Sequence, residues 1–417
     1  MSSRAQTNWS SEAMQARIRR RYGAERRFKA VGVAAVAISL GFLAFLLGTM
    51  LWNGLGGFME TRVKVSIDFP ASDLVLDPQS LTGPGAEAAL GAADIEGTVA
   101  AAAEANYGTG GASLISDASW LRVRDAIAED PSLLERKSEF HLPASSALDT
   151  AAKGEGDPQF ERQYSRLQQS GAISRGFNAN FLTGSDATDP SAVGIWGAFK
   201  GSLLTMIVTL ALAFPIGVLS AVYLEEYAPR NRWTEIIEVS INNLAAVPSI
   251  IFGLLGLAVF LNFMHLPRSA PLVGGLTLAL MTMPVIVIAG RNALKAVPPS
   301  VRDGALAVGA SPVQVVFHHV LPLALPGILT GTIIGAARAL GETAPLLMIG
   351  MRAFMASPPS GFTDPATVLP VQIFLWSDEV SRGFVEKTSA AIIVLLVFLL
   401  AMNGIAIYLR NKFEQRW

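Results

Sequence analysis

The sequence predicts an all-α polytopic membrane protein with six transmembrane helices and a mixed α/β domain inserted after the first of them. Apolar residues make up 51% of the chain and charged residues only 16%, and the mean hydropathy is +0.42. Runs of about 20 residues almost free of charge recur, which is the length that an α-helix needs to cross a bilayer. A long polar stretch separates the first two runs and predicts a folded domain there.

Charge and cysteine content exclude several classes of function. The formal net charge is −1, so no overall basic surface points to nucleic acid as a partner. The chain has no cysteine, which excludes disulfides, thiol nucleophiles and thiolate metal sites. His318 and His319 are adjacent, so they point to different faces of a helix, and no carboxylate lies at metal spacing. We therefore expect no metal site, and the composition is compatible with a bacterial inner-membrane protein.

The N-terminal segment predicts the orientation of the chain. Residues 1–29 carry eight Arg and Lys side chains against two Glu, and we expect them to form a cytoplasmic basic tail. The apolar run at 30–52 is longer than a signal-peptide core and shows no clear small-residue cleavage site. We therefore expect it to be an uncleaved first transmembrane helix. The positive charges that flank it place the N-terminus in the cytoplasm.

Residues 53–195 predict a separate domain on the periplasmic side. Between Glu60 and Asp189 there are 20 acidic and 10 basic side chains, and no run is apolar enough to span a bilayer. Val63, Val65, Ile67 and Phe69 alternate with polar residues, which predicts a strand. The stretch 119–136 has a helical pattern broken by Pro131, and 158–169 is a second expected helix. The sequence assigns no role to this domain.

Residues 196–410 contain five further apolar runs. These spans are expected at Gly197–Tyr223, Ile236–Phe263, Leu272–Asn292, Leu321–Gly350 and Ser389–Leu409, with residues 411–417 as a cytoplasmic tail. Basic residues of the short loops favour the cytoplasmic side by eight to four, in agreement with the N-terminal tail. Pro215, Pro248, Pro284 and Pro345 lie within the spans, either as packing devices or as kinks that let helices rock.

A semi-polar loop, residues 291–320, leads into the fifth span and carries the first of two motifs. Asp303-Gly304-Ala305 is followed by Gly309, a nine-residue spacer from Ala310 to His318, and then Leu321-Pro322. Asp303 is expected near a helix start, where a carboxylate interacts favourably with the helix dipole. Small residues here would let another protein approach closely. The plainer alternative is an ordinary helix-turn-helix between two spans.

The second motif places two charges in the fifth span. It reads Ala-Arg-Ala-Leu-Gly-Glu-Thr-Ala-Pro-Leu-Leu from Ala337 to Leu347. Arg338 and Glu342 are four residues apart, so they share one helix face, and their cost in lipid predicts that they face a protein-lined or water-filled interior. One interpretation is an ion pair that only fixes the helix to its neighbours. The other is that Arg338 contacts an oxyanion, with Glu342 balancing the charge and Thr343 adding a hydroxyl.

The first motif resembles the cytoplasmic coupling loop of ABC-transporter permeases, and the second is similar to the signature of PstA-type phosphate permeases. The resemblance covers about residues 197–410, and Gly304 and His319 depart from the usual Ala and aliphatic residue of the coupling motif. It implies six transmembrane helices of the ABC importer permease type. It also implies the permease subunit of a phosphate importer in the bacterial inner membrane, of the subset with an extra N-terminal periplasmic domain.

The same resemblance implies the partners. They are a second homologous permease, a dimer of cytoplasmic ATPases and a periplasmic phosphate-binding protein. No Gly-Lys pair occurs in the chain, so it has no phosphate-binding loop of the P-loop type. We therefore expect no cofactor and no enzyme activity in this chain, with ATP bound by a partner subunit. Asp303, Gly304, Ala305, Gly309, Leu321 and Pro322 would form the docking element for that ATPase.

Three alternatives remain open on the sequence. The cargo could be another solute, namely sulfate, molybdate or an organic compound. An intramembrane enzyme would need a nucleophile and base or a metal group within the spans, and the chain lacks cysteine there. A membrane scaffold or sensor could be built on the periplasmic domain. Deleting residues 53–195 would separate the last class, because a permease should keep some transport, and neighbouring genes would identify the class most directly.

Overall fold

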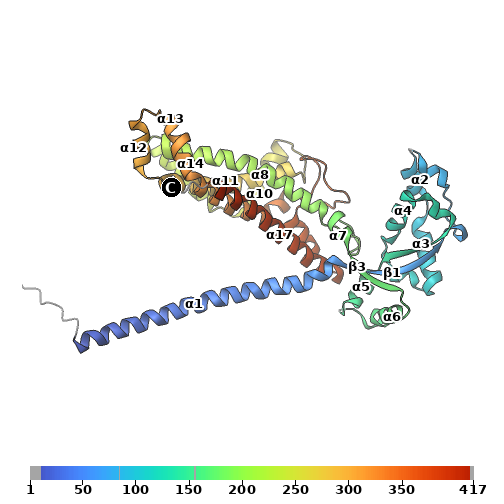
Figure 1. The fold of residues 1–417 in the computed structure, drawn as a ribbon. Helices are drawn as coiled ribbons and strands as arrows, with labels where there is room; N and C mark the ends of the chain where they lie inside the picture. The colour runs from blue at the N-terminus through green and yellow to red at the C-terminus, as the bar shows by residue number, and fades with distance from the viewer. Residues whose placement is uncertain (1–10, 84, 155, 414–417) are drawn as a thin grey trace, which may run out of the picture. The chain divides into compact units, whose positions relative to one another are not determined.

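The computed structural model describes residues 11–83, 85–154 and 156–413. Residues 1–10 of the predicted basic tail and 414–417 of the predicted C-terminal tail lie outside the described residues. The chain divides into two compact units, Met1–Asn53 and Gly54–Trp417. The first unit consists of one long helix in its described part, and the second contains the inserted domain together with the remaining helices (Figure 1).

The described part of the first unit lies in α1, Glu12–Leu55, a single helix of 44 residues whose last two residues belong to the second unit. The predicted first span at 30–52 lies within it, as expected. The solvated tail expected before it is helical from Glu12 onward, since Arg, Glu, Ala and Gln all favour helix and no proline interrupts them. An ion pair between Lys29 and Glu25, 2.6 Å apart and one turn from each other, adds to this stretch.

A three-stranded antiparallel sheet organises the inserted domain. Its order is β2-β1-β3, formed by β1 (Met59–Asp68), β2 (Lys137–Pro143) and β3 (Ile173–Phe177). The predicted alternation is confirmed, because Val63, Val65 and Ile67 are at most 1% exposed. These side chains pack beneath the domain's helices in one apolar core. The sheet is therefore central to the domain although it is small.

Helices account for most of the rest of this domain. They are α2 (Ala86–Ala92), α3 (Ile95–Tyr107), α4 (Ser119–Glu129), α5 (Ser146–Ala152), α6 (Pro158–Gln169) and α7 (Ala179–Thr183). The predicted helix at 119–136 does break at Pro131, where a 3₁₀ turn begins. The helix predicted at 158–169 is α6, and Asp157 caps its first turn. The domain is thus mostly helical, with a small sheet.

The remaining helices of the second unit include its candidate membrane spans. They are α8 (Trp196–Val222), α9 (Arg232–Ala245), α10 (Ser249–Gly256), α11 (Pro271–Lys295), α12 (Pro299–Ala307), α13 (Pro312–Gln314), α14 (Leu321–Gly341), α15 (Ala344–Met348), α16 (Leu369–Ser377) and α17 (Arg382–Phe413). In the described part of the whole chain, α1 included, five helices are long and apolar enough to cross a membrane, and six if one bent pair counts as a span.

Two of the predicted spans are interrupted, contrary to the continuous helices expected. The predicted span at 236–263 consists of α9 and a second segment, Ser249–Phe263, in which α10 continues as a π-helix from Leu257; the two segments meet at a bend of 101°. Pro248 explains the break, because it lacks an N–H and disfavours helical geometry in the residue before it. The predicted span at 321–350 ends at Gly341, and α15 starts only at Ala344. Both breaks lie next to residues that the sequence singled out.

Small residues hold α8, α11 and α14 close together. A Cβ on Gly275 of α11 would lie 2.4 Å from Val208 Cβ of α8, and one on Gly331 of α14 would lie 2.1 Å from Ala289 Cβ of α11. Such close approach supplies packing energy where lipid offers no hydrophobic drive between helices. In this unit α12 and α13 lie at one end of the helices and the inserted domain at the other (Figure 1).

A group of buried and partly buried charges joins the inserted domain to the start of α17. Lys153 of the domain contacts Glu386 at 2.6 Å and Asp149 at 2.8 Å, and also donates to the carbonyl oxygens of Gly56 and Met59. Lys387 is only 3% exposed, and its Nζ donates to Gly57 O at 3.0 Å. We call these four side chains the Lys153 clamp: Asp149, Lys153, Glu386 and Lys387. They fix the domain to the helix rather than leaving it on a free tether.

Candidate functional site

Arg338 and Glu342 form an ion pair at the end of α14. Arg338 lies in the last helical turn, where a cation interacts favourably with the helix dipole, and its Nε is 3.5 Å from Glu342 Oε1. Glu342 has left the helix, with an extended ψ of 125°, so the pair bridges the helix and the break after it. The Arg338 side chain is 47% exposed and Glu342 19%. The Arg338 guanidinium therefore has N–H groups that form no hydrogen bond with any other described residue of this chain.

Two segments that each follow a helix break, α10 and α15, pack on each other close to this pair. Gly253 of α10 packs directly on α15, where an added Cβ would lie only 2.6 Å from Pro345 Cα. The segment before α10 is the 101° bend, and the segment before α15 is the pair Glu342-Thr343. Interrupted helices whose ends come together within the membrane provide the polar backbone and helix ends that ion and solute sites use. Thr343 precedes α15, and its hydroxyl makes no bond that caps this helix.

The coupling loop contains α12, and its end is set by Gly309. Gly309 has φ +86°, with its N–H donating to Leu306 O at 3.0 Å and the N–H of Ala310 donating to Ala305 O at 3.1 Å. This is the glycine-dependent way of ending a helix. Nothing in the described part of the chain lies within 4 Å of a Cβ added there. The turn is thus strained for other residues but open to an approaching protein.

The other predicted loop residues surround this turn. Asp303 and Gly304 are exposed, while Ala305 is buried at 7%. Asp303 lies beyond the first turn of α12, contrary to the expectation of a helix start. The helix dipole therefore stabilises its carboxylate only weakly. Leu321 and Pro322 begin α14. The structure therefore places Leu321 and Pro322 at one end of α14 and Arg338 near the other, roughly 25 Å along the helix at 1.5 Å per residue.

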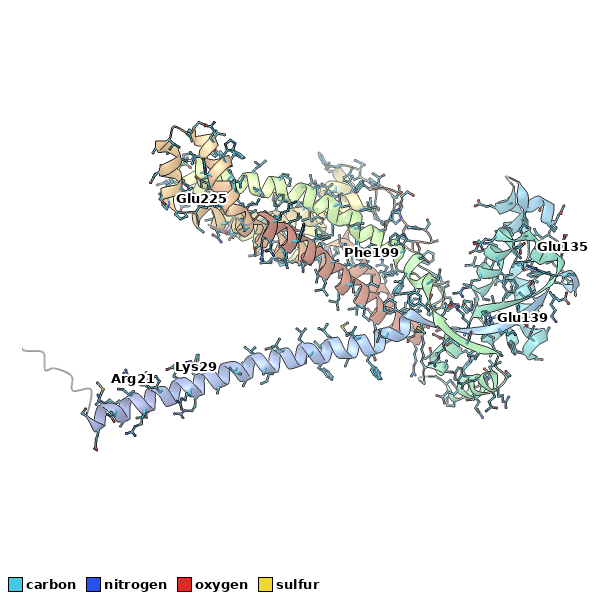
Figure 2. All side chains as sticks on the ribbon, in the orientation of Figure 1. Arg21, Lys29, Glu135, Glu139, Phe199 and Glu225 are labelled. Atoms are coloured by element: carbon cyan, nitrogen blue, oxygen red, sulfur yellow. The ribbon has the colours of Figure 1, made fainter. Side chains whose placement is uncertain are left out.

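The sequence reasoning missed the ion pairs that anchor the loop. Arg302 Nη2 lies 2.6 Å from Glu226 Oε1 and also donates to Leu294 O, while its Nη1 donates to Val297 O. Its hydrogen bond to Glu226 raises the pKa of the Arg302 guanidinium above its ordinary value. Arg291 forms ion pairs with Glu225, which is labelled in Figure 2, at 3.4 Å and with Glu238 at 2.6 Å. The sequence signal that could have indicated these ion pairs is the two adjacent acids after the second span, Glu225 and Glu226.

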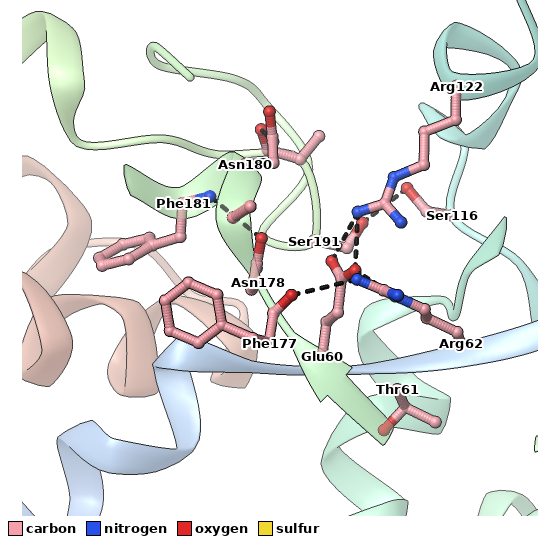
Figure 3. Close-up of polar contacts among 12 residues, drawn as sticks. Glu60, Thr61, Arg62, Ser116, Arg122, Phe177, Asn178, Asn180, Phe181 and Ser191 are labelled. Carbon is pink, nitrogen blue, oxygen red and sulfur yellow. Dashed lines mark hydrogen bonds and ion pairs between the residues drawn. The ribbon is translucent and has the colours of Figure 1, made fainter. Parts of the chain in front are cut away.

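A second network that the sequence did not indicate fixes the base of the inserted domain (Figure 3). Glu60, 5% exposed, accepts hydrogen bonds from Arg122 Nη2 at 2.7 and 2.8 Å and from Arg62 Nε at 2.6 Å. Arg62 also donates to Phe177 O at 3.1 Å. These contacts join the starts of β1 and α4 to the end of β3, and one carboxylate here balances two guanidinium groups. Their local effect is to hold the two chain segments that enter and leave the domain.

The described residues hold no group of three or more His, Cys, Asp or Glu side chains that could bind a metal ion. The chemistry that the site offers is therefore that of a guanidinium, a carboxylate and helix ends. Such groups recognise an oxyanion by charge and by directed hydrogen bonds. They supply no nucleophile.

Comparison with known families finds matches to two separate parts of the chain. Residues 213–416 match the family described as binding-protein-dependent transport system inner membrane component. Residues 15–162 match a domain of unknown function (DUF3333). The structure of the MetNI methionine ABC transporter aligns with 53% of this chain and 98% of its own, at 18% identity and a TM-score of 0.43.

Three curated proteins show the range of similarity. A probable ABC transporter permease, YqgI of Bacillus subtilis, is 32% identical over 44% of this chain and 61% of its own. Phosphate transport system permease protein PstA 1 of Mycobacterium tuberculosis is 35% identical over 38% of this chain and 51% of its own. PstA of Haemophilus influenzae is 30% identical over 54% of this chain and 77% of its own. The chain thus spans about half to three-fifths of the length of the first two relatives.

Proposed function

This chain belongs to the family of PstA phosphate transport system permeases, and from that membership we propose that it is the membrane-spanning subunit of an ATP-driven importer of inorganic phosphate. The observation that carries the proposal is the Arg338–Glu342 pair at a helix break that packs on a second broken helix. Arg338 offers a planar set of donors to a phosphate oxyanion, and Glu342 keeps the bound anion from being held too tightly.

The exposure of Arg338 supports the proposed partners. A cation in a membrane helix costs roughly 2.5–3.5 kcal/mol on insertion scales unless protein or water covers it. Arg338 is about half exposed in the single chain, so a second homologous permease would complete the wall around it. A cytoplasmic ATPase dimer would bind the coupling loop around Gly309, because this chain has no P-loop of its own. A periplasmic phosphate-binding protein would deliver the anion to the other end.

Opposite placement of the loop and the inserted domain supports the proposed sidedness. In the bacterial inner membrane, residues 53–195 would be periplasmic, and the coupling loop and both termini cytoplasmic. Reporter fusions after Gly110 and after Arg230 should therefore report opposite sides, because α8 carries the chain from one end of the helices to the other. The same side at both positions would contradict this topology.

Uptake by the assembled importer tests the cargo. In proteoliposomes with the complete complex and ATP, labelled phosphate should accumulate, and a tenfold excess of sulfate should not compete. Glu342 supplies the reason, because its carboxylate can accept the proton of HPO₄²⁻, which sulfate lacks. Glu342→Gln should therefore reduce the preference for phosphate over sulfate. Equal competition by sulfate in the unaltered protein would favour a general oxyanion importer instead.

A further inference from the structure

A polar pocket of about 420 Å³ opens at the end of the helices that carries the inserted domain. Four separate segments form it: the linker before α8, the loop after α15, α16 and the start of α17. The side chains that matter for its chemistry are Asp186, Arg352, Gln372, Trp376, Asp378 and Glu379. Its volume lies at the lower end of the range for sites that hold one small group. None of these residues was singled out by the sequence motifs.

Gln372 is the unusual member of this lining. Its side chain is 99% buried, and its Oε1 has no hydrogen-bond partner among the described residues. Its amide NH₂ group lies beside Asp186 and helps to lower the pKa of that carboxyl. An unpaired buried carbonyl oxygen costs about 1–3 kcal/mol, so such groups in folded proteins usually face a ligand, a water molecule or a partner. Gln372 faces the pocket on α16, a short helix that is too short to cross the membrane.

The charge of the pocket indicates what it would bind. Asp186, Asp378 and Glu379 line it against the single cation Arg352, so negative charge is in excess. Burial raises the pKa of Asp186 above its ordinary value, against the hydrogen bonds that it accepts from Trp376 Nε1 at 3.1 Å and from the Gln372 side chain. A second positive group would relieve this cost. Trp376 and Phe384, 6.2 Å apart between ring centroids and at most 4% exposed, pack beside these carboxylates and hold this part of the pocket in place.

We propose that this pocket receives an Arg or Lys side chain from the solute-delivering protein that docks on this end of the permease. The inference rests on the proposed function for the identity of that partner. The carboxylates would pair with the arriving cation, and the Gln372 Oε1 would accept one of its hydrogen bonds. A protein is the expected source because Arg352, Asp378 and Glu379, which form the rim, are exposed. The nearby start of α17 contacts the inserted domain through Glu386 and Lys153, at the end of the helices opposite α12 (Figure 1).

Binding of a free guanidinium group to the full-length chain tests the pocket itself. The chain has no cysteine, so Thr188→Cys gives a unique site on the pocket wall for an environment-sensitive fluorophore. Titration with methylguanidinium chloride at constant ionic strength should give a saturable response. Gln372→Leu and Glu379→Gln should each weaken it about tenfold, as expected for a charge-assisted hydrogen bond. Glu135→Gln, an exposed carboxylate on the inserted domain, is the matched control and should change nothing.

Two readouts separate this proposal from its alternatives. Gln372→Leu should keep a melting temperature close to that of the unaltered chain, so that its weakened titration reports lost binding rather than unfolding. In proteoliposomes with the assembled importer, Glu379→Gln should raise the concentration of delivering protein needed for half-maximal uptake without changing the maximal rate. A flat titration, or equal response in all variants, overturns the pocket. Failure of phosphate uptake would overturn the proposed cargo and leave the binding result standing.

Discussion

Removing the charge of Arg338 should lower phosphate uptake by about 100-fold, as expected for loss of a bidentate, charge-assisted contact in a desolvated site. We expect Arg338→Met to do this, and Arg338→Lys to recover little because an ammonium lacks the planar fork. Arg268→Met is the matched control, since Arg268 is an exposed cation in the turn before α11. Uptake of labelled phosphate in proteoliposomes, normalised to inserted protein, measures the effect.

Paired substitutions distinguish recognition from an ion pair that only supports the fold. If the pair is structural, replacing both partners by Met should be tolerated, because deleting an ion pair together is often neutral. The exchange Arg338→Glu with Glu342→Arg should then also restore much of the uptake lost in either single variant. If Arg338 meets phosphate, both double variants should assemble yet fail to transport. Substantial phosphate uptake by either double variant would refute direct recognition by Arg338.

Replacing Gly309 by Glu should abolish transport while leaving membrane insertion intact. A bulky carboxylate there would clash with a docked ATPase and bury an unpaired charge in the interface. The control is Gly108→Glu, because Gly108 has a similar φ of +81°, is equally exposed and also has nothing within 4 Å of an added Cβ. It lies in the inserted domain, so it carries the same backbone strain without the coupling loop. Transport and transport-coupled ATP hydrolysis are the readouts.

Substituting Gly309 by Ala or Asn distinguishes a role in ending α12 from a role in ATPase docking, because the two roles predict opposite orders of transport activity. If Gly309 serves only to end α12, Asn should transport better than Ala, because Asn adopts positive φ more readily. If an ATPase approaches closely, Ala should transport better than Asn, because it is smaller. The docking role therefore predicts transport in the order Ala, Asn, Glu. Normal transport by a well-inserted Gly309→Glu protein would exclude docking at this turn.

The sequence predicted those features that local pattern determines. The alternation at Val63, Val65 and Ile67 gave the central strand, because one buried face demands period two. Charge-free runs located the membrane helices. The pattern could not show that the third and fifth spans break, because Pro248 and Pro345 are equally compatible with a kinked continuous helix. Which of the two forms occurs depends on packing between distant segments, such as the close contact between Gly253 of α10 and Pro345 of α15.

The candidate sites divide in the same way. Short-range spacing correctly paired Arg338 with Glu342, because i and i+4 side chains are neighbours on a helix. Arg302 and Glu226 are far apart in the chain, and so are the walls of the Gln372 pocket. Only the packing of separate helices brings them together, and no spacing rule reaches across such distances. The roles of Arg338, Glu342, Thr343 and the coupling loop stay predictions until the variants above are measured.

The Lys153 clamp changes what a truncation of this protein can mean. Excising residues 53–195 would remove Lys153 together with the carbonyl of Gly57, leaving Glu386 unpaired and the ammonium of Lys387 without its acceptor at the outer end of α17. Stranded charges of that kind destabilise by several kcal/mol, so a shortened chain could lose transport through misassembly alone. A truncation that also carries Glu386→Gln and Lys387→Met would remove this artefact. Only in that background would lost uptake reveal what the domain itself contributes.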